Sequence, residues 1–268
     1  MSERPFRRVV LMCDAACDIR RAVAEAASLA ARWGAALHGV YIDDENLRRL
    51  AALPFGQQVS LSSAAGTEEL SVATMGSLSS ALGAGMKRAL AEVAEAQRLH
   101  WTFGTIRDLP SAASVRAEAG DILVVEAAAR AFSGTWAPHA SWDKSPAAFS
   151  GTVLLKARGD GADGILVLLP EDDTTQAKVL AACAALARDG EAITLAGDAS
   201  VLAAAEAAIG KHFDASQRKH INSLPLDKDR SGLMRLLRAR RRPGLVVVHA
   251  DSAAEWLADV KTDILFVR

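Results

Sequence analysis

The residue best placed to do chemistry is Asp14, which directly follows the apolar run "RRVVLMC" at residues 7–13. A buried strand followed by a carboxylate is typical of the carboxyl edge of an open α/β sheet, where such proteins bind their ligands. A carboxylate at this point can equally cap the helix that follows. The pattern around Asp14 therefore predicts either a ligand contact or a helix cap, and taken alone it favours the cap.

The three cysteines, Cys13, Cys17 and Cys183, do not form a recognisable site. Cys13 and Cys17 have no nearby Cys or His that would complete a zinc site. An odd and low cysteine count argues against a disulfide framework and suits a reducing compartment, so we expect a cytoplasmic protein. Because a free cysteine packs as a small apolar residue, we expect buried, inert thiols rather than metal or redox chemistry.

The remaining residue types give no catalytic pattern. The six histidines show no metal-ligand spacing; they are at 38, 100, 139, 212, 220 and 249. His249 ends an apolar run and could line a cleft, although a partly buried imidazole fits the same pattern. Neither a G-x-S-x-G elbow nor a Walker A sequence is present. Without a general base, a metal site or a phosphate cradle, we expect the chain not to be an enzyme.

The overall charge gives no sign of a polyanionic partner. The chain of 268 residues has 31 Lys and Arg against 32 Asp and Glu, and no apolar run approaches the roughly 20 residues that span a bilayer. We expect neither nucleic acid nor a membrane as partner. The polar N-terminus leads directly into a strand and predicts no signal peptide. Five arginines at 235–244 could bind an acidic ligand, but we favour the basic end of a helix.

Apolar runs alternate with Ala-rich helical patterns along the whole chain, which predicts a parallel sheet covered by helices. Strands are expected at residues 7–13, 36–42, 101–107, 121–125, 151–157, 165–170, 191–197, 216–222, 244–250 and 263–268. Helices are expected at residues 19–33, 75–100, 176–188, 199–210 and 231–242, with shorter ones at 43–54, 112–119 and 252–260.

The same succession of elements occurs twice. The segment "RGDGADG" at 158–164 reads as a linker, and "GDILVVEA" in the first half parallels "PGLVVVHA" in the second. We therefore predict an α/β protein with two doubly wound parallel five-stranded sheets in tandem. Residues 1–157 form the first domain in this interpretation, and residues 165–268 form a shorter second domain.

Residues 9–44 carry a resemblance to a known family. They read as an apolar strand, an Asp, a short polar turn, an Ala-rich helix, Gly-Ala and a second strand leading to acidic residues. This arrangement, with its repetition, resembles the universal stress protein family in its tandem two-domain form. The resemblance implies an α/β/α sandwich of the adenine nucleotide alpha hydrolase-like type. It also implies a nucleotide contact at Asp14, with Cys13 beside it, and an adenine facing the backbone of Val40 at the end of its strand; Glu171 takes the place of Asp14 in the second half.

The phosphate motif of this family is missing from both halves. ATP-binding members carry Gly-x2-Gly-x9-Gly-[Ser/Thr] after the fourth strand, where glycines let backbone amides approach phosphates. Here Glu126 and three alanines follow that strand, and Gly134 and Gly151 lack the required upstream glycines. The second half has no glycine after Gly244. We therefore expect no cofactor, with weak binding of ATP or AMP in one half as the alternative.

Two further features bear on function. Trp136 and Trp142 follow the fourth strand and could fill the space that a nucleotide occupies in ATP-binding members. The Ser- and Gly-rich segment at 56–85 is either a partner-binding or lid segment, or an ordinary loop leading into a helix.

These features predict a non-catalytic stress-response or regulatory protein that acts through contacts with a protein partner. A small-molecule sensor is the alternative, and a weak nucleotide hydrolase is the least supported class. Because paired fifth strands are common in the family, we expect residues 151–157 and 263–268 to pair within the chain, which would cover two sheet edges. A homodimer is the further assembly that we consider.

Overall fold

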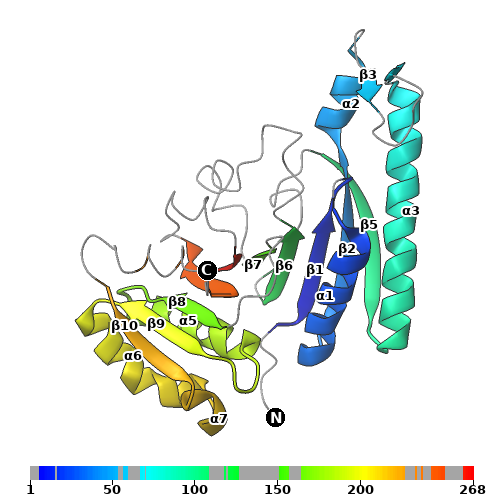
Figure 1. Cartoon of the computed structure of the whole chain (residues 1–268). Coiled ribbons are helices and arrows are strands. Elements are labelled where there is room, and N and C mark those ends of the chain that lie inside the picture. Colours follow the sequence, from blue (N-terminus) through cyan, green and yellow to red (C-terminus); the bar gives the residue numbers. More distant parts are fainter. Residues whose placement is uncertain are drawn as a thin grey trace.

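A single mixed sheet of ten strands forms the centre of the protein in the computed structural model. The structure describes residues 6–15, 17–53, 57–59, 67–69, 71–108, 118, 120–126, 151–156, 164–226, 233, 237, 243–250 and 262–268. The strand order is β10-β9-β8-β11-β12-β7-β6-β1-β2-β5. In Figure 1 the first half of the chain lies on the right and the second half on the left.

The ten strands come in equal numbers from the two halves. Those of the first half are β1 (Arg8–Cys13), β2 (Ala36–Asp44), β5 (Trp101–Asp108), β6 (Asp121–Glu126) and β7 (Thr152–Lys156). Those of the second half are β8 (Ile165–Leu168), β9 (Ile193–Gly197), β10 (Ile221–Pro225), β11 (Leu245–His249) and β12 (Asp263–Val267). Within each half all pairs are parallel, and the third, second, first, fourth and fifth strands follow one another across the sheet.

The α/β class predicted from the sequence is confirmed, but the strands do not form two separate sheets. β12 pairs antiparallel with β7, with Leu265 opposite Leu154. This is the intramolecular strand pairing expected from the sequence, and it merges the strands of both halves into one sheet. The physical reason is that each fifth strand would otherwise present a row of unpaired backbone groups at an edge.

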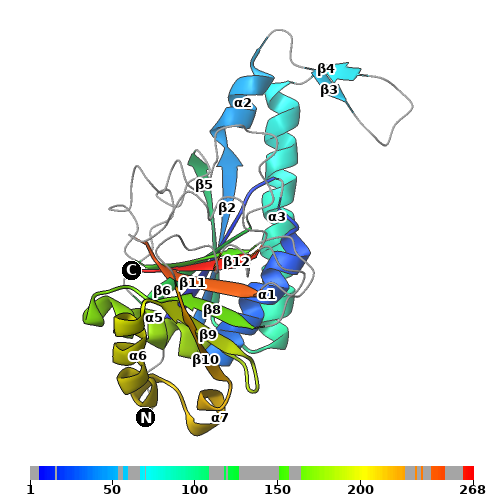
Figure 2. The ribbon, with the colours of Figure 1, turned by 60° about the vertical axis from the view of Figure 1, so that its left-hand side comes forward.

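Helices of both halves cover the same face of this sheet. They are α1 (Ile19–Trp33), α3 (Val72–Ala96), α5 (Asp173–Leu186) and α6 (Ala199–His212). A short helix, α2 (Glu45–Ala51), leads to a small hairpin of β3 (Gln57–Val59) and β4 (Thr67–Glu69). α2, the hairpin and the start of α3 extend beyond the edge of the sheet (Figure 2).

The helices begin where the sequence supplies side-chain caps. Asp18 accepts a hydrogen bond from the backbone of Arg21 at the start of α1, and Asp172 and Asp198 cap α5 and α6 in the same way. α1 ends at Gly34, whose φ of 59° lies in the left-handed region that favours glycine. Along α1 a stripe of alanines packs against the sheet, which allows helix and strands to approach closely.

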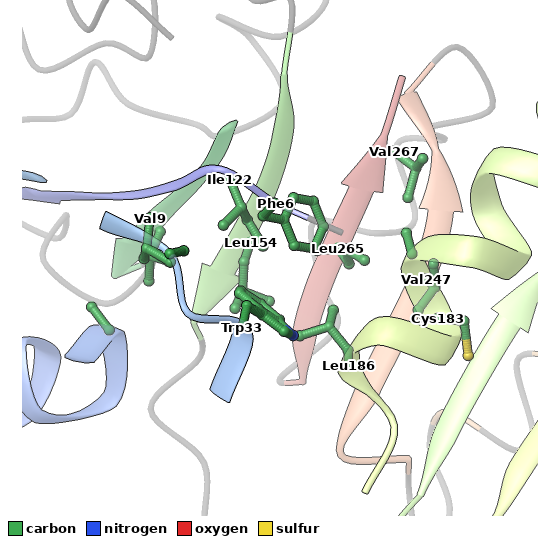
Figure 3. Close-up of a cluster of buried hydrophobic side chains, with 14 of the residues drawn as sticks. Phe6, Val9, Trp33, Ile122, Leu154, Cys183, Leu186, Val247, Leu265 and Val267 are labelled. Atoms are coloured by element: carbon green, nitrogen blue, oxygen red, sulfur yellow. The ribbon is translucent and has the colours of Figure 1, made fainter. Parts of the chain in front are cut away.

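One hydrophobic core runs without a break from the first half into the second. Figure 3 shows Trp33, Phe6 and Leu154 of the first half in the same cluster as Leu186 and Leu265 of the second. The rings of Phe6 and Trp33 are in contact, with centroids 4.8 Å apart. The two halves are therefore held together by buried apolar surface as well as by strand pairing.

Polar contacts reinforce this junction. The indole Nε1 of Trp33 donates to the backbone oxygen of Ala185 over 3.0 Å. Arg32 donates to the backbone oxygens of Leu186 and Ala187, the first over 2.8 Å. These oxygens belong to the carboxyl-terminal end of α5, where carbonyls lack partners within the helix and a cation is favourable.

Lys156, at the end of β7, forms a second polar link between the halves. Its ammonium group lies between the carboxylates of Glu25 in α1 and Asp263 in β12. Burial alone would lower the pKa of Lys156, but the two carboxylates outweigh that effect and raise the pKa. Lys156 is therefore charged at neutral pH and is shared by the two carboxylates.

Several local predictions differ from the structure. The strand predicted at 216–222 begins only at Ile221, because Asp214 and Gln217 form a capping box that starts a short helix, α7 (Ala215–Arg218). α3 begins at Val72, three residues earlier than predicted, because Ser71 caps it. Most of the helices predicted at 112–119, 231–242 and 252–260 lie outside the described residues.

Candidate functional site

The candidate site lies at the carboxyl ends of β1 and β2, under the first turns of α3. A small pocket opens there, with Met75, Leu78 and Leu82 of α3 on its apolar side. Tyr41 and Asp43 form part of its polar side. The pocket has room for about one water molecule. This pocket by itself is too small for a nucleotide.

Asp43 is the centre of a polar cluster that joins four elements. Its carboxylate accepts a hydrogen bond from the Ser79 hydroxyl of α3 over 2.7 Å. It also lies 3.3 Å from both Arg48 Nη1 of α2 and Arg107 Nε of β5. The contact with Arg107 follows from strand register, because these two residues are directly opposite each other in the β2–β5 pair. The carboxylate is thus engaged by two cations and a hydroxyl, which suits a structural anchor better than a general base.

Tyr41 supplies a buried phenol beside this cluster. Burial raises the pKa of Tyr41, the Ser79 hydrogen bond opposes that effect, and the nearby carboxylates of Asp43 and Asp14 add to it. The phenol therefore remains protonated at neutral pH. Gly83 of α3 passes so close to the Tyr41 ring that a Cβ on it would be 3.2 Å from Cδ1. The missing side chain lets α3 lie against the ring and close the pocket.

Asp14 is half-buried at the carboxyl end of β1, where the sequence placed it. The alternative that Asp14 caps the following helix is wrong, because Asp18 is the N-cap of α1. The backbone oxygen of Asp14 instead accepts a hydrogen bond from the amide of Cys17 over 3.3 Å. Asp14 and Tyr41 thus lie near each other, as the effect of Asp14 on the phenol shows. The predicted ligand contact of Asp14 stays a prediction.

Cys13 and Val40, the other two residues of the predicted site, are both buried in β1 and β2. Val40 is not at the end of its strand, as predicted, because β2 continues to Asp44. It pairs with Met12 of β1 on one side and with Gly104 of β5 on the other. Its backbone groups therefore belong to the sheet rather than to its open edge.

The thiols are buried to different degrees. Cys13 and Cys183 are buried as predicted, whereas Cys17 is only half-buried. The sulfur atoms of Cys13 and Cys17 lie 2.9 Å apart. Burial raises the pKa of the Cys183 thiol, which keeps it protonated at neutral pH.

The corresponding edge of the second half differs. Glu171 is exposed after β8, and the neighbouring Asp172 is occupied as the cap of α5. His249 is half-buried at the end of β11. Trp136, Trp142 and the arginine-rich segment at 235–242, apart from Leu237, lie outside the described residues, so the predictions made for them stay untested.

The site is an acidic edge of the sheet, in which the carboxylate of Asp43 is paired with two arginines. Asp14, Asp43 and Asp44 bring three carboxylates to one end of two neighbouring strands, which opposes binding of a phosphate at this point. Within the described residues no group of His, Cys, Asp and Glu side chains could hold a metal ion. In the same part of the chain, no helix is long and apolar enough to cross a membrane.

Sequence reasoning did not single out Tyr41, Asp43, Arg48 or Ser79. The stretch "YIDD" at 41–44 was visible as the acidic end of a strand. Its partners come from α2, α3 and β5, which are distant in sequence, so only the tertiary arrangement brings them together.

Comparison of the chain with models of protein families and with curated proteins gives no match.

Proposed function

We propose that the chain is a non-catalytic, tandem universal-stress-like protein that acts in a stress response or in regulation through protein contacts. The resemblance of residues 9–44 supports this proposal, as does the identical strand order of the two halves. In this proposal residues 1–157 and 165–268 are two sandwich domains that share one sheet, with 158–164 as their linker.

The observation that carries the proposal is the distribution of exposed apolar side chains. Among the described residues, the exposed large apolar side chains gather in one region. They are Leu50 and Leu53, in and just after α2, and Val72 and Leu78, in the first two turns of α3. We name these four residues the α2–α3 patch. Because the region extends beyond the sheet (Figure 2), a partner can reach it without displacing the core.

The charges near the α2–α3 patch indicate what kind of partner fits it. Arg49 of α2 pairs with Glu45 one turn earlier, and Arg48 pairs with Asp43. Since both arginines of α2 are paired with carboxylates, the α2 part of the patch offers aliphatic surface beside compensated charges. The partner we propose is an apolar protein face, such as one side of an amphipathic helix, rather than a nucleic acid.

We also propose that the ATP phosphate site is lost, and the acidic edge of β1 and β2 supports this. A phosphate placed there would meet the carboxylates of Asp14 and Asp44, and Arg48 and Arg107 are already bound to Asp43. The sequence after β6 offers no glycine-rich turn in compensation.

A double substitution tests the protein contact. Leu50→Ser with Leu53→Ser removes two exposed side chains that the core does not need, so the free energy of unfolding should change by less than about 0.5 kcal/mol each. The matched control is Ala203→Ser with Ala207→Ser on the exposed face of α6.

Chemical cross-linking in the native cell, followed by mass spectrometry, should give cross-links from the α2–α3 region in the wild type and in the α6 control. The patch variant should lose them. Sedimentation velocity of the purified protein would show whether the partner is a second copy of the chain. Equal cross-linking by all three proteins would refute the proposed contact surface.

A small-molecule sensor is the second candidate, and the position of Asp14 at the carboxyl end of β1, where open α/β sheets bind their ligands, is the observation that favours it. Isothermal titration with ATP, ADP, AMP and adenosine separates the two. We expect no heat from the three phosphorylated ligands. Binding of ATP that Asp14→Ala weakens would support the sensor and would overturn the lost phosphate site.

A further inference from the structure

The two cysteines at the start of α1 are arranged for covalent chemistry with each other. The Sγ atoms of Cys13 and Cys17 are 2.9 Å apart, less than about 1 Å beyond the length of a disulfide bond. Cys13 ends β1, and Cys17 directly precedes Asp18, the cap of α1. The hydrogen bond from the Cys17 amide to the Asp14 oxygen closes a tight turn that holds both cysteines in place.

The two thiols have different roles in this arrangement. Cys17 is half-buried, so a small oxidant can reach it, whereas Cys13 is only 2% exposed. Cys17 also lies just before the cap of a 15-residue helix, and its sulfur donates a hydrogen bond to the sulfur of Cys13. Cys183 lacks these features, because it is fully buried within α5 with no exposed surface.

We propose that Cys13 and Cys17 are a reversible redox site, in which a hydroperoxide oxidises Cys17 and Cys13 then closes an intramolecular disulfide. The Cys17 thiolate attacks one oxygen of the hydroperoxide, the O–O bond breaks, and a sulfenic acid forms while the second oxygen leaves as an alcohol or water after taking up a proton. Cys13 sulfur then attacks the Cys17 sulfur, the S–O bond breaks, and water leaves with the Cys13 proton.

The reaction balances with the hydroperoxide as the oxidant. Two thiols lose two protons and two electrons, and one hydroperoxide is reduced to water and an alcohol, or to two waters for hydrogen peroxide. A dithiol reductant reverses the step by thiol–disulfide exchange. Since Ala15, which lines the candidate pocket, is one of the three residues between the two cysteines, the disulfide fixes this part of the pocket wall.

Thiol counting after oxidation tests the proposal. The purified full chain is treated with hydrogen peroxide, denatured and alkylated with N-ethylmaleimide, and its intact mass is measured. The untreated chain should take up three maleimides, one for each cysteine. The oxidised chain should take up one, on Cys183, and before alkylation it should weigh two hydrogen atoms less. Peptide mapping should place the disulfide between Cys13 and Cys17, and dithiothreitol should restore three reactive thiols.

Single substitutions show which two cysteines form the disulfide. Cys17→Ser should abolish the disulfide and leave the thiols of Cys13 and Cys183 reactive after the same treatment. Cys183→Ala should still form the disulfide, so that no reactive thiol remains after peroxide. The half-buried position of Cys17 makes its substitution compatible with folding, which circular dichroism checks. Three reactive thiols after peroxide, a stable sulfinic acid at Cys17, or disulfide-linked dimers in place of the intramolecular bond would each overturn the proposal.

Discussion

Substitution of Trp33 should reveal how strongly the two halves depend on each other. Trp33 is 7% exposed, its ring contacts Phe6, and its indole nitrogen donates to Ala185 in the other half. Trp33→Ala removes all of these contacts and leaves a cavity at the junction (Figure 3), so it should lower the free energy of unfolding by about 3–5 kcal/mol. Trp33→Phe keeps most of the ring and loses the hydrogen bond, at a cost of about 1–2 kcal/mol.

Urea unfolding followed by far-ultraviolet circular dichroism measures both variants against the wild type. The difference in the free energy of unfolding between the two variants separates the contribution of ring packing from that of the hydrogen bond. A second transition in Trp33→Ala would show that the halves unfold separately once the junction is weakened. If Trp33→Ala were within about 1 kcal/mol of the wild type, the shared core across the two halves would be refuted.

Three further perturbations probe the first half. Burial, followed by the charge of a nearby arginine, lowers the pKa of His38 in the folded protein. As the pH drops below about 6.5, the unfolded state therefore binds the proton first, and the free energy of unfolding should fall. His38→Gln should flatten this dependence of the free energy on pH, which urea titrations on either side of pH 6.5 measure. Gly39→Ala would place a Cβ 2.1 Å from Leu90 Cδ1 and should lower the free energy of unfolding, measured by thermal unfolding, by about 1–3 kcal/mol. Gly85→Ala meets no atom within 4 Å and should stabilise α3 by about 0.5–1 kcal/mol. Equal effects of the two substitutions would contradict the observed packing. Lys156→Met leaves two carboxylates without their shared cation and should lower the chemical denaturation midpoint at neutral pH, an effect that high salt should reduce if the link is electrostatic.

The sequence indicated the α/β class because burial on both faces of a parallel strand leaves a local trace. "RRVVLMC" and "DILVV" are apolar without alternation, and both became central strands. The family resemblance, which implies paired fifth strands, predicted that residues 151–157 and 263–268 would pair and so cover two strand edges, and this pairing is observed.

The sequence did not resolve the elements whose limits depend on polar caps. Residues 216–222 look extended by composition, but the capping box at Asp214 starts a helix there. The sequence analysis considered only Asp14 as a cap of the following helix, whereas the structure assigns the cap to Asp18, directly before that helix. Such choices rest on hydrogen-bond geometry, which residue types alone do not fix.

What the sequence by itself determined about this protein is which segments are buried strands and helices, because hydrophobic periodicity is local. Only the tertiary structure decided that Arg107 faces Asp43, that Trp33 reaches Ala185 and that the Cys13 and Cys17 sulfurs meet. The physical reason is that these contacts depend on strand register, crossover geometry and tight turns. Those are set by the packing of the whole sheet and its helices, not by neighbours along the chain.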